Sequence, residues 1–173
     1  MLRSLREFKL STRSALVLIL VFTVVVVADQ VTKALVTSAL EPGDVVPIVP
    51  GFFNLTLTFN RGVAFGMFAH FSDGPRYAVL ILTALIALSA VVFFFVRDYA
   101  HDLLAQCALV MIMAGAAGNI IDRIRLGMVV DFLDAYYQQY HWPAFNVADS
   151  AICIGVFILI FRRPERALNV SAG

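Results

Sequence analysis

The chain has 173 residues, of which 61% are hydrophobic and 14% are charged, and its mean hydropathy is +0.86. Soluble domains are nearer half apolar and about a quarter charged, so this composition excludes an ordinary soluble domain. It indicates a polytopic membrane protein that forms a single unit over residues 1–173. The net charge of +1, without a basic run, gives no reason to expect a nucleic-acid partner.

The first apolar segment predicts a transmembrane helix at about residues 15–36. Basic residues precede it, as in a secretory signal peptide, but no Ala-x-Ala cleavage site follows, so we expect a retained helix. At about 1.5 Å per residue it spans roughly 33 Å, enough for a bilayer core of about 30 Å. Asp29 and Lys33 lie four residues apart near its end and can pair. They form either a structural ion pair at the interface or a wall of a functional cavity.

Residues 42–75 predict a small β unit that rests on the membrane surface with one apolar face. Prolines and glycines divide this stretch into turns, and Leu55–Phe59 alternates in polarity with the period of a strand. Asn60, Arg61 and Gly62 then predict a turn. Asn60 either stabilises this turn or belongs to a functional site.

Three more apolar segments predict transmembrane helices at about residues 77–96, 103–121 and 146–161. The third span contains the small-residue run Ala114–Gly118, which allows helix backbones to approach closely. Asn119 and Asp122 follow on one face of its end. If Asn146 caps the last helix, that helix is short, roughly 24 Å, and Asp149 near its start lies at membrane depth.

The distribution of basic residues predicts the orientation of the four spans. With both termini on one side, that side carries eight basic residues and the other side carries five. Because basic residues favour the cytoplasmic side, both termini should be cytoplasmic and the polar residues should lie toward the outer face. The eight are Arg3, Arg6, Lys9, Arg13, Arg97, Arg162, Arg163 and Arg166, and the five are Lys33, Arg61, Arg76, Arg123 and Arg125.

Asp131 and Asp149 are candidates for an acid–base pair. An aromatic loop that includes Tyr136 and Trp142 joins them, and we expect it to lie flat at the outer surface while both its ends dip inward. Two close carboxylates in a low dielectric tend to share a proton, so one acts as base and the other as acid. Such a pair can activate water against a peptide carbonyl without a metal or a covalent intermediate. Asp149, near a helix start, is the better candidate for the ionised member.

Simpler interpretations exist for each polar residue. Asn146 and Asp149 can form a helix cap, Asp122 and Arg123 an interfacial ion pair, and Asp131 can cap a turn. A proton-coupled transporter that uses an intramembrane acid relay is the alternative function. We expect no metal or cofactor, since no Cys-x-x-Cys occurs and the histidines are scattered; the cysteines, Cys107 and Cys153, are expected to be packing residues.

Five short motifs occur in order along most of the chain: Asp29–Lys33, Asn60–Phe65, Gly118–Arg123, Val129–Phe132 and Phe145–Ser150. With them the sequence resembles the bacterial lipoprotein signal peptidases (signal peptidase II), an aspartic protease family of the inner membrane. The resemblance implies four transmembrane helices with a small outer β-cradle between the first two. It also implies an endopeptidase that cuts diacylglyceryl-modified prolipoproteins just before the lipidated cysteine.

The resemblance further implies a role for each matching residue. Asp131 and Asp149 would be the catalytic dyad. The supporting or substrate-contacting positions would be Asp29, Lys33, Asn60, Gly62, Asn119, Asp122, Arg123 and Asn146. We expect a monomer in contact with membrane lipid, a multi-pass protein of the bacterial inner membrane whose active site lies toward the outer face.

Overall fold

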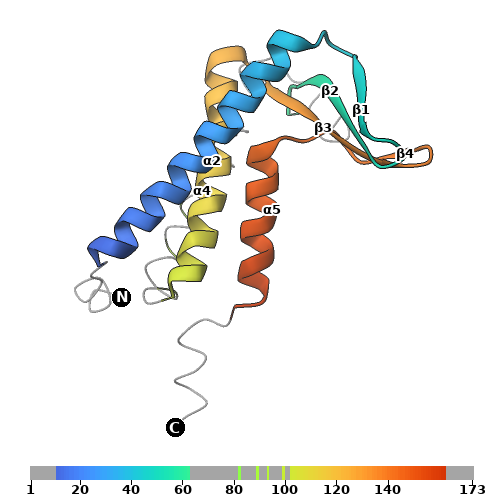
Figure 1. The fold of residues 1–173 in the computed structure, drawn as a ribbon. Helices are drawn as coiled ribbons and strands as arrows, with labels where there is room; N and C mark the ends of the chain where they lie inside the picture. The colour runs from blue at the N-terminus through green and yellow to red at the C-terminus, as the bar shows by residue number, and fades with distance from the viewer. Residues whose placement is uncertain are drawn as a thin grey trace.

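The structure, a computed structural model, describes residues 11–62 and 102–162 together with Leu82, Ser89, Phe93 and Tyr99. Its helices stand side by side, and a small sheet lies at one end of them (Figure 1). The helices described are α2 (Thr12–Ala39), α4 (Leu103–Leu126) and α5 (Val147–Ile160). The strands are β1 (Val45–Val49), β2 (Phe53–Asn60), β3 (Val129–Tyr137) and β4 (Tyr140–His141). Helices α2 and α4 run toward the sheet, and α5 runs away from it (Figure 1).

Two of the described helices, α2 and α4, are long and apolar enough to cross a membrane, and α5 is a shorter apolar helix. Helix α2 is a few residues longer at each end than the predicted 15–36, and it begins after Ser11, whose hydroxyl accepts a hydrogen bond from the Ser14 amide at 3.0 Å. The predicted span 77–96 lies outside the described residues except for Leu82, Ser89 and Phe93, which are helical.

Helix α4 continues beyond the predicted end at residue 121 and reaches Leu126. The prediction ended the helix where charged residues begin, but those charges find partners, and basic residues in a last turn are favoured by the helix dipole. Gly127 ends the helix with a φ of 72°, a left-handed conformation that glycine adopts without strain. Helix α5 begins as predicted, with Asn146 as its N-cap.

Small residues let α4 approach its neighbours closely, as the run Ala114–Gly118 predicted. A Cβ on Gly115 would collide with the carbonyl oxygen of Ala148, and one on Gly155 would lie 2.5 Å from that of Ala108. Helix α4 therefore packs against α5 along both glycines, and it also packs against α2. This close packing brings the polar residues of three helices within reach of one another at the sheet end.

The sheet is antiparallel with the order β1-β2-β3-β4. Its first two strands fall within the predicted β unit 42–75, of which residues 63–75 lie outside the described residues. The prediction that an aromatic loop joins Asp131 to Asp149 is wrong, because Val129–Tyr137 is strand β3 and pairs along β2. The strand was missed because its partner lies about 70 residues earlier in the chain, and pairing at that range leaves no local signal.

Candidate active site

Strand β3 places Asp131 between two other segments. On one side Asp131 is opposite Thr58 of β2. On the other side Leu133 pairs with Phe145: the Leu133 amide donates to the Phe145 carbonyl at 2.8 Å, and the Leu133 carbonyl accepts from the Phe145 amide at 3.0 Å. The chain that follows Phe145 therefore passes beside Asp131 on its way into α5.

Asn146 contacts both candidate catalytic acids. Its side-chain amide donates to Asp131 Oδ1 at 2.7 Å, and its backbone amide donates to Asp149 Oδ2 at 3.2 Å. Its Oδ1 accepts from the Asp149 backbone amide at 2.9 Å, so Asn146 and Asp149 also form the capping box of α5. The predicted cap is therefore present, and the residue that forms it also donates a hydrogen bond to each of the two carboxyls.

Asn60 approaches Asp131 from β2. Its Nδ2 donates to Asp131 Oδ2 at 3.0 Å, and its Oδ1 accepts from the Gly62 amide at 2.8 Å. Gly62 has a φ of 77°, which favours glycine and completes the predicted turn. Asn60 thus both stabilises its turn and contacts Asp131.

Asn119 and Arg123 approach Asp149 from α4. Asn119 Nδ2 donates to Asp149 Oδ1 at 2.8 Å, and Arg123 Nη1 donates to the Asn119 carbonyl at 3.3 Å. Within the described residues, Arg123 Nε is buried and has no hydrogen-bond partner. Arg123 and Asp149 are both partly exposed, whereas Asp131 and Asn146 are buried.

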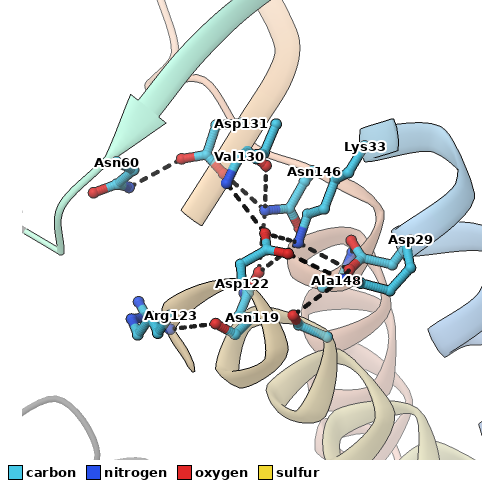
Figure 2. A network of polar contacts seen from close by, with 12 residues as sticks. Asp29, Lys33, Asn60, Asn119, Asp122, Arg123, Val130, Asp131, Asn146 and Ala148 are labelled. Carbon is cyan, nitrogen blue, oxygen red and sulfur yellow. Dashed lines mark hydrogen bonds and ion pairs between the residues drawn. The ribbon is translucent and has the colours of Figure 1, made fainter. Parts of the chain in front are cut away.

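A buried charged triad lies beneath these residues, formed by Asp29, Lys33 and Asp122. Lys33 Nζ lies 2.8 Å from Asp29 Oδ2 and 2.8 Å from Asp122 Oδ2, and all three side chains are at most 4% exposed. Figure 2 shows how the triad meets the two chain segments next to it, at Val130–Asp131 and at Asn146–Ala148. Asp29 accepts from the Ala148 amide at 2.9 Å, and Asp122 accepts from the Val130 amide at 3.1 Å. The predicted pairing of Asp29 with Lys33 is confirmed, and Asp122 pairs with this lysine as well.

Gln30 belongs to the same cluster and was not predicted as a site residue. Its Nε2 donates to Asp122 Oδ1 at 3.0 Å and to Asp29 Oδ2 at 3.1 Å, so it joins two members of the triad. The available signal was an amide in an apolar helix directly after Asp29 and three residues before Lys33, since polar residues at membrane depth tend to have partners. Gly118 is part of the motif Gly118–Arg123 but was not predicted as a site residue. A Cβ at this position would lie 2.5 Å from Asp29 Oδ2, so there is no room for a larger side chain beside the triad.

The environment of Asp131 favours a bound proton. Burial raises the pKa of Asp131 from an ordinary 3.8 to about 6, and the nearby charge of Asp149 adds to the increase. Hydrogen bonds from Asn60 and Asn146 and the charge of Lys33 oppose this pKa shift without cancelling it. Among residues 11–62 and 102–162, no three His, Cys, Asp or Glu side chains are grouped as a metal site. The arrangement can hold a protonated Asp131 near enough to Asp149 for the two carboxyls to influence each other.

The similarity to known proteins covers most of the chain. The model of a family described as "Signal peptidase (SPase) II" matches residues 21–163. The lipoprotein signal peptidase of Syntrophotalea carbinolica is 46% identical over 90% of this chain and 96% of its own length. That of Geobacter sulfurreducens is 47% identical over 77% of this chain and 82% of its own length.

Solved structures agree with the sequence comparison. A bacterial membrane enzyme determined by the in meso method at 1.9 Å resolution has a TM-score of 0.74 and 39% identity, covering 83% of this chain and 90% of the other. A second, at 2.3 Å resolution, has a TM-score of 0.73 and 38% identity, with 83% and 85% covered. The chain therefore belongs to the signal peptidase II family, which consists of bacterial aspartic proteases of the membrane.

Proposed function

We propose that Asp131 and Asp149 are the catalytic dyad of an endopeptidase that removes signal peptides from diacylglyceryl-modified prolipoproteins, cutting just before the lipidated cysteine. The observation that carries this proposal is the position of Asn146, which donates one hydrogen bond to each carboxylate. A second support is the raised pKa of Asp131, which suits an acid that holds a proton near pH 6.

The two carboxyls divide the proton transfers. Asp149, near the start of α5, has its charge favoured by the helix dipole and takes a proton from the attacking water. Asp131 gives its proton to the scissile carbonyl oxygen, so a neutral tetrahedral diol forms. Asp149 then protonates the leaving nitrogen, the C–N bond breaks, and Asp131 recovers a proton from the diol. Both carboxyls return to their starting states without a metal or a covalent intermediate.

The remaining site residues support the dyad or meet the substrate. Asp29, Lys33 and Asp122 hold the backbones of Ala148 and Val130, while Asn119 and Asn146 orient the carboxylates. Asn60, Gly62 and Arg123 lie on the more exposed side of the site, where a peptide would approach. Arg123 Nε has no hydrogen-bond partner among the described residues, and we propose it as a donor for a substrate carbonyl.

We propose four transmembrane helices in a single protease domain over residues 1–173, acting as a monomer in the bacterial inner membrane. The described residues contribute α2, α4 and α5, and the fourth proposed helix, at about residues 77–96, lies outside them except for Leu82, Ser89 and Phe93. The basic residues favour cytoplasmic termini, which puts the site toward the outer face.

A reporter active only outside the cytoplasm should work near Ser72 or Gln138 and fail after Arg97 or Arg166. The reverse pattern would overturn this orientation.

The outer sheet offers a surface for membrane lipid. Large apolar and aromatic side chains are exposed in and beside its strands, and they include Val45, Ile48, Phe52, Tyr137 and Trp142, each at least 53% exposed. Aromatic residues of this kind favour the lipid–water interface, so the sheet is expected to rest on the membrane surface.

The test of the proposed function compares two precursors with purified protein in lipid. A diacylglyceryl-modified precursor should be cut before its cysteine, and the unlipidated form should be cut much more slowly. The acyl chains add binding free energy at about 0.8 kcal/mol per buried CH₂, which explains this expectation. Equal cleavage of both forms would overturn the lipid requirement. The family match gives no support to the alternative of a proton-coupled transporter.

A further inference from the structure

Three side-chain amides contact the dyad, and each must point its NH₂ group, not its oxygen, at a carboxylate. They are Asn60 and Asn146, which donate to Asp131, and Asn119, which donates to Asp149. An amide turned the other way would place its oxygen against a carboxyl oxygen, and a hydrogen bond could then form only where that oxygen carries the Asp131 proton. The orientation of each amide is therefore a condition for the hydrogen bonds that hold the dyad.

Backbone amides fix two of these three orientations. Asn60 Oδ1 accepts from the Gly62 amide at 2.8 Å, and Asn146 Oδ1 accepts from the Asp149 amide at 2.9 Å. A backbone N–H can only donate, so in both cases the oxygen must face it and the NH₂ must face Asp131. These two amides are fixed by the turn after β2 and by the start of α5.

Asn119 differs from the other two, because the donor at its oxygen is a side chain. Lys33 Nζ donates to Asn119 Oδ1 at 3.1 Å, and an ammonium group cannot accept a hydrogen bond. The Asn146 amide also reaches this oxygen, at 3.2 Å, but it divides two hydrogens among three acceptors, and its shortest contact, 2.7 Å, is to Asp131. Lys33 is thus the principal group that holds the Asn119 oxygen away from Asp149.

We infer that Lys33 is a positioning residue for the dyad, because it fixes the orientation of the Asn119 amide so that Asn119 donates to Asp149. The lysine is well suited to this task, since its three N–H donors are matched by three acceptors, Asp29, Asp122 and Asn119. It is 3% exposed, so water does not compete for these contacts. The inference rests on the proposed function and assigns Lys33 a role beyond pairing with the two buried acids.

A double-mutant cycle in kcat and KM tests this role. Lys33→Met should lower kcat at least about tenfold, with KM within about threefold, because a misplaced catalytic group affects the chemical step more than binding. Asn119→Ala should have a similar effect. If Lys33 acts through Asn119, the double variant should have a kcat within about threefold of Asn119→Ala alone. Losses that multiply in the double variant would overturn the inference.

Asn60 supplies the matched control, because the Gly62 amide fixes its orientation and Lys33 does not contact it. Losses from Lys33→Met and Asn60→Ala should therefore multiply, within about threefold. Equal coupling in both cycles would also overturn the inference, since it would indicate a general loss of structure. Thermal unfolding in detergent reports whether each variant is folded.

Removing Lys33 leaves two buried carboxylates without a cation. This is destabilising and can prevent the variant from folding. If Lys33→Met does not accumulate, the same cycles are measured in Asp122→Asn protein, where loss of the lysine leaves the triad with its wild-type net charge. The outcomes have the same meaning in that background. Failure of the proposed function is separate, because it would appear as intact precursor in the wild-type reaction.

Discussion

Two ion-pair clusters lie at opposite ends of helix α4, and they differ in burial. At the sheet end, Lys33 pairs with Asp29 and Asp122, and these side chains are at most 4% exposed. At the other end, Arg162 Nη2 lies 2.6 Å from Asp102 Oδ2, and the arginine side chain is 41% exposed. The Arg162–Asp102 contact joins the start of α4 to the end of α5, whereas the buried triad joins α2 to the segments that carry the proposed dyad.

The difference in burial decides what each cluster contributes. A charge removed from water costs several kcal/mol unless partners compensate, so the triad is sensitive to the loss of any one member. An exposed pair contributes only about 0–1 kcal/mol, because water and salt screen it. A burial cost is expected where function requires a fixed geometry, and the triad holds the backbone amides of Ala148 and Val130, next to Asp149 and Asp131.

The largest effect is expected from the dyad itself. Asp131→Asn and Asp149→Asn keep the side-chain shape but remove proton transfer, so each should lower turnover at least about a hundredfold. The double variant should be little worse than either single one, because residues that act as a unit are not additive.

Asp134→Asn is the matched control. Asp134 is also buried on β3, but it binds Asn54 and His141, so the turnover of this variant should stay within about threefold of wild type. Precursor cleavage with folded protein measures all four, and near-normal turnover in either dyad variant would contradict the assignment.

The second prediction concerns pH and the proton on Asp131. Since burial raises the pKa of Asp131 to about 6, this carboxyl keeps its proton below that pH and loses it above. The singly protonated dyad is then depleted, so kcat/KM should fall by about tenfold per pH unit above roughly pH 6. At lower pH a second protonation should also reduce kcat/KM, giving a bell-shaped profile. A profile that is flat between about pH 5 and 8 would exclude a proton on Asp131 as a requirement.

The third prediction concerns the close packing of Gly118 against the Asp29 carboxylate. In Gly118→Ala the new Cβ would lie 2.5 Å from Asp29 Oδ2, so the carboxylate has to move and its bond to the Ala148 amide weakens. Turnover should fall about tenfold, because a small displacement near the dyad is costly. In an Asp29→Ala background the same glycine substitution should cost little more, since the colliding group is absent. An undiminished loss in that background would show that the glycine acts through other contacts.

Contacts between residues close in sequence were predictable, whereas contacts between distant segments were not. The pair of Asp29 with Lys33 and the cap formed by Asn146 and Asp149 are local contacts, and helix periodicity predicts both. The contact of Asp122 with the Val130 amide depends on where β3 lies, and β3 depends on a strand about 70 residues earlier. Gln30 was missed for the same reason, since its partner Asp122 is on another helix. The motifs predicted which residues to propose for the site, but they did not predict the contacts between distant segments.

The smallest effect is expected at the exposed end of α4. Arg162→Gln removes the contact with Asp102, but Asp102 keeps its helix-capping bond from the Ala105 amide at 3.1 Å. The free energy of unfolding should fall by at most about 1 kcal/mol, and raising the salt concentration should reduce that difference further. Turnover should stay within about twofold of wild type, because this pair contacts neither chain segment next to the dyad. Thermal unfolding in detergent at two salt concentrations, together with precursor cleavage, measures both quantities. A loss of turnover as large as that of Gly118→Ala would mean that the far end of α4 transmits to the site, and burial would then no longer explain the difference between the two clusters.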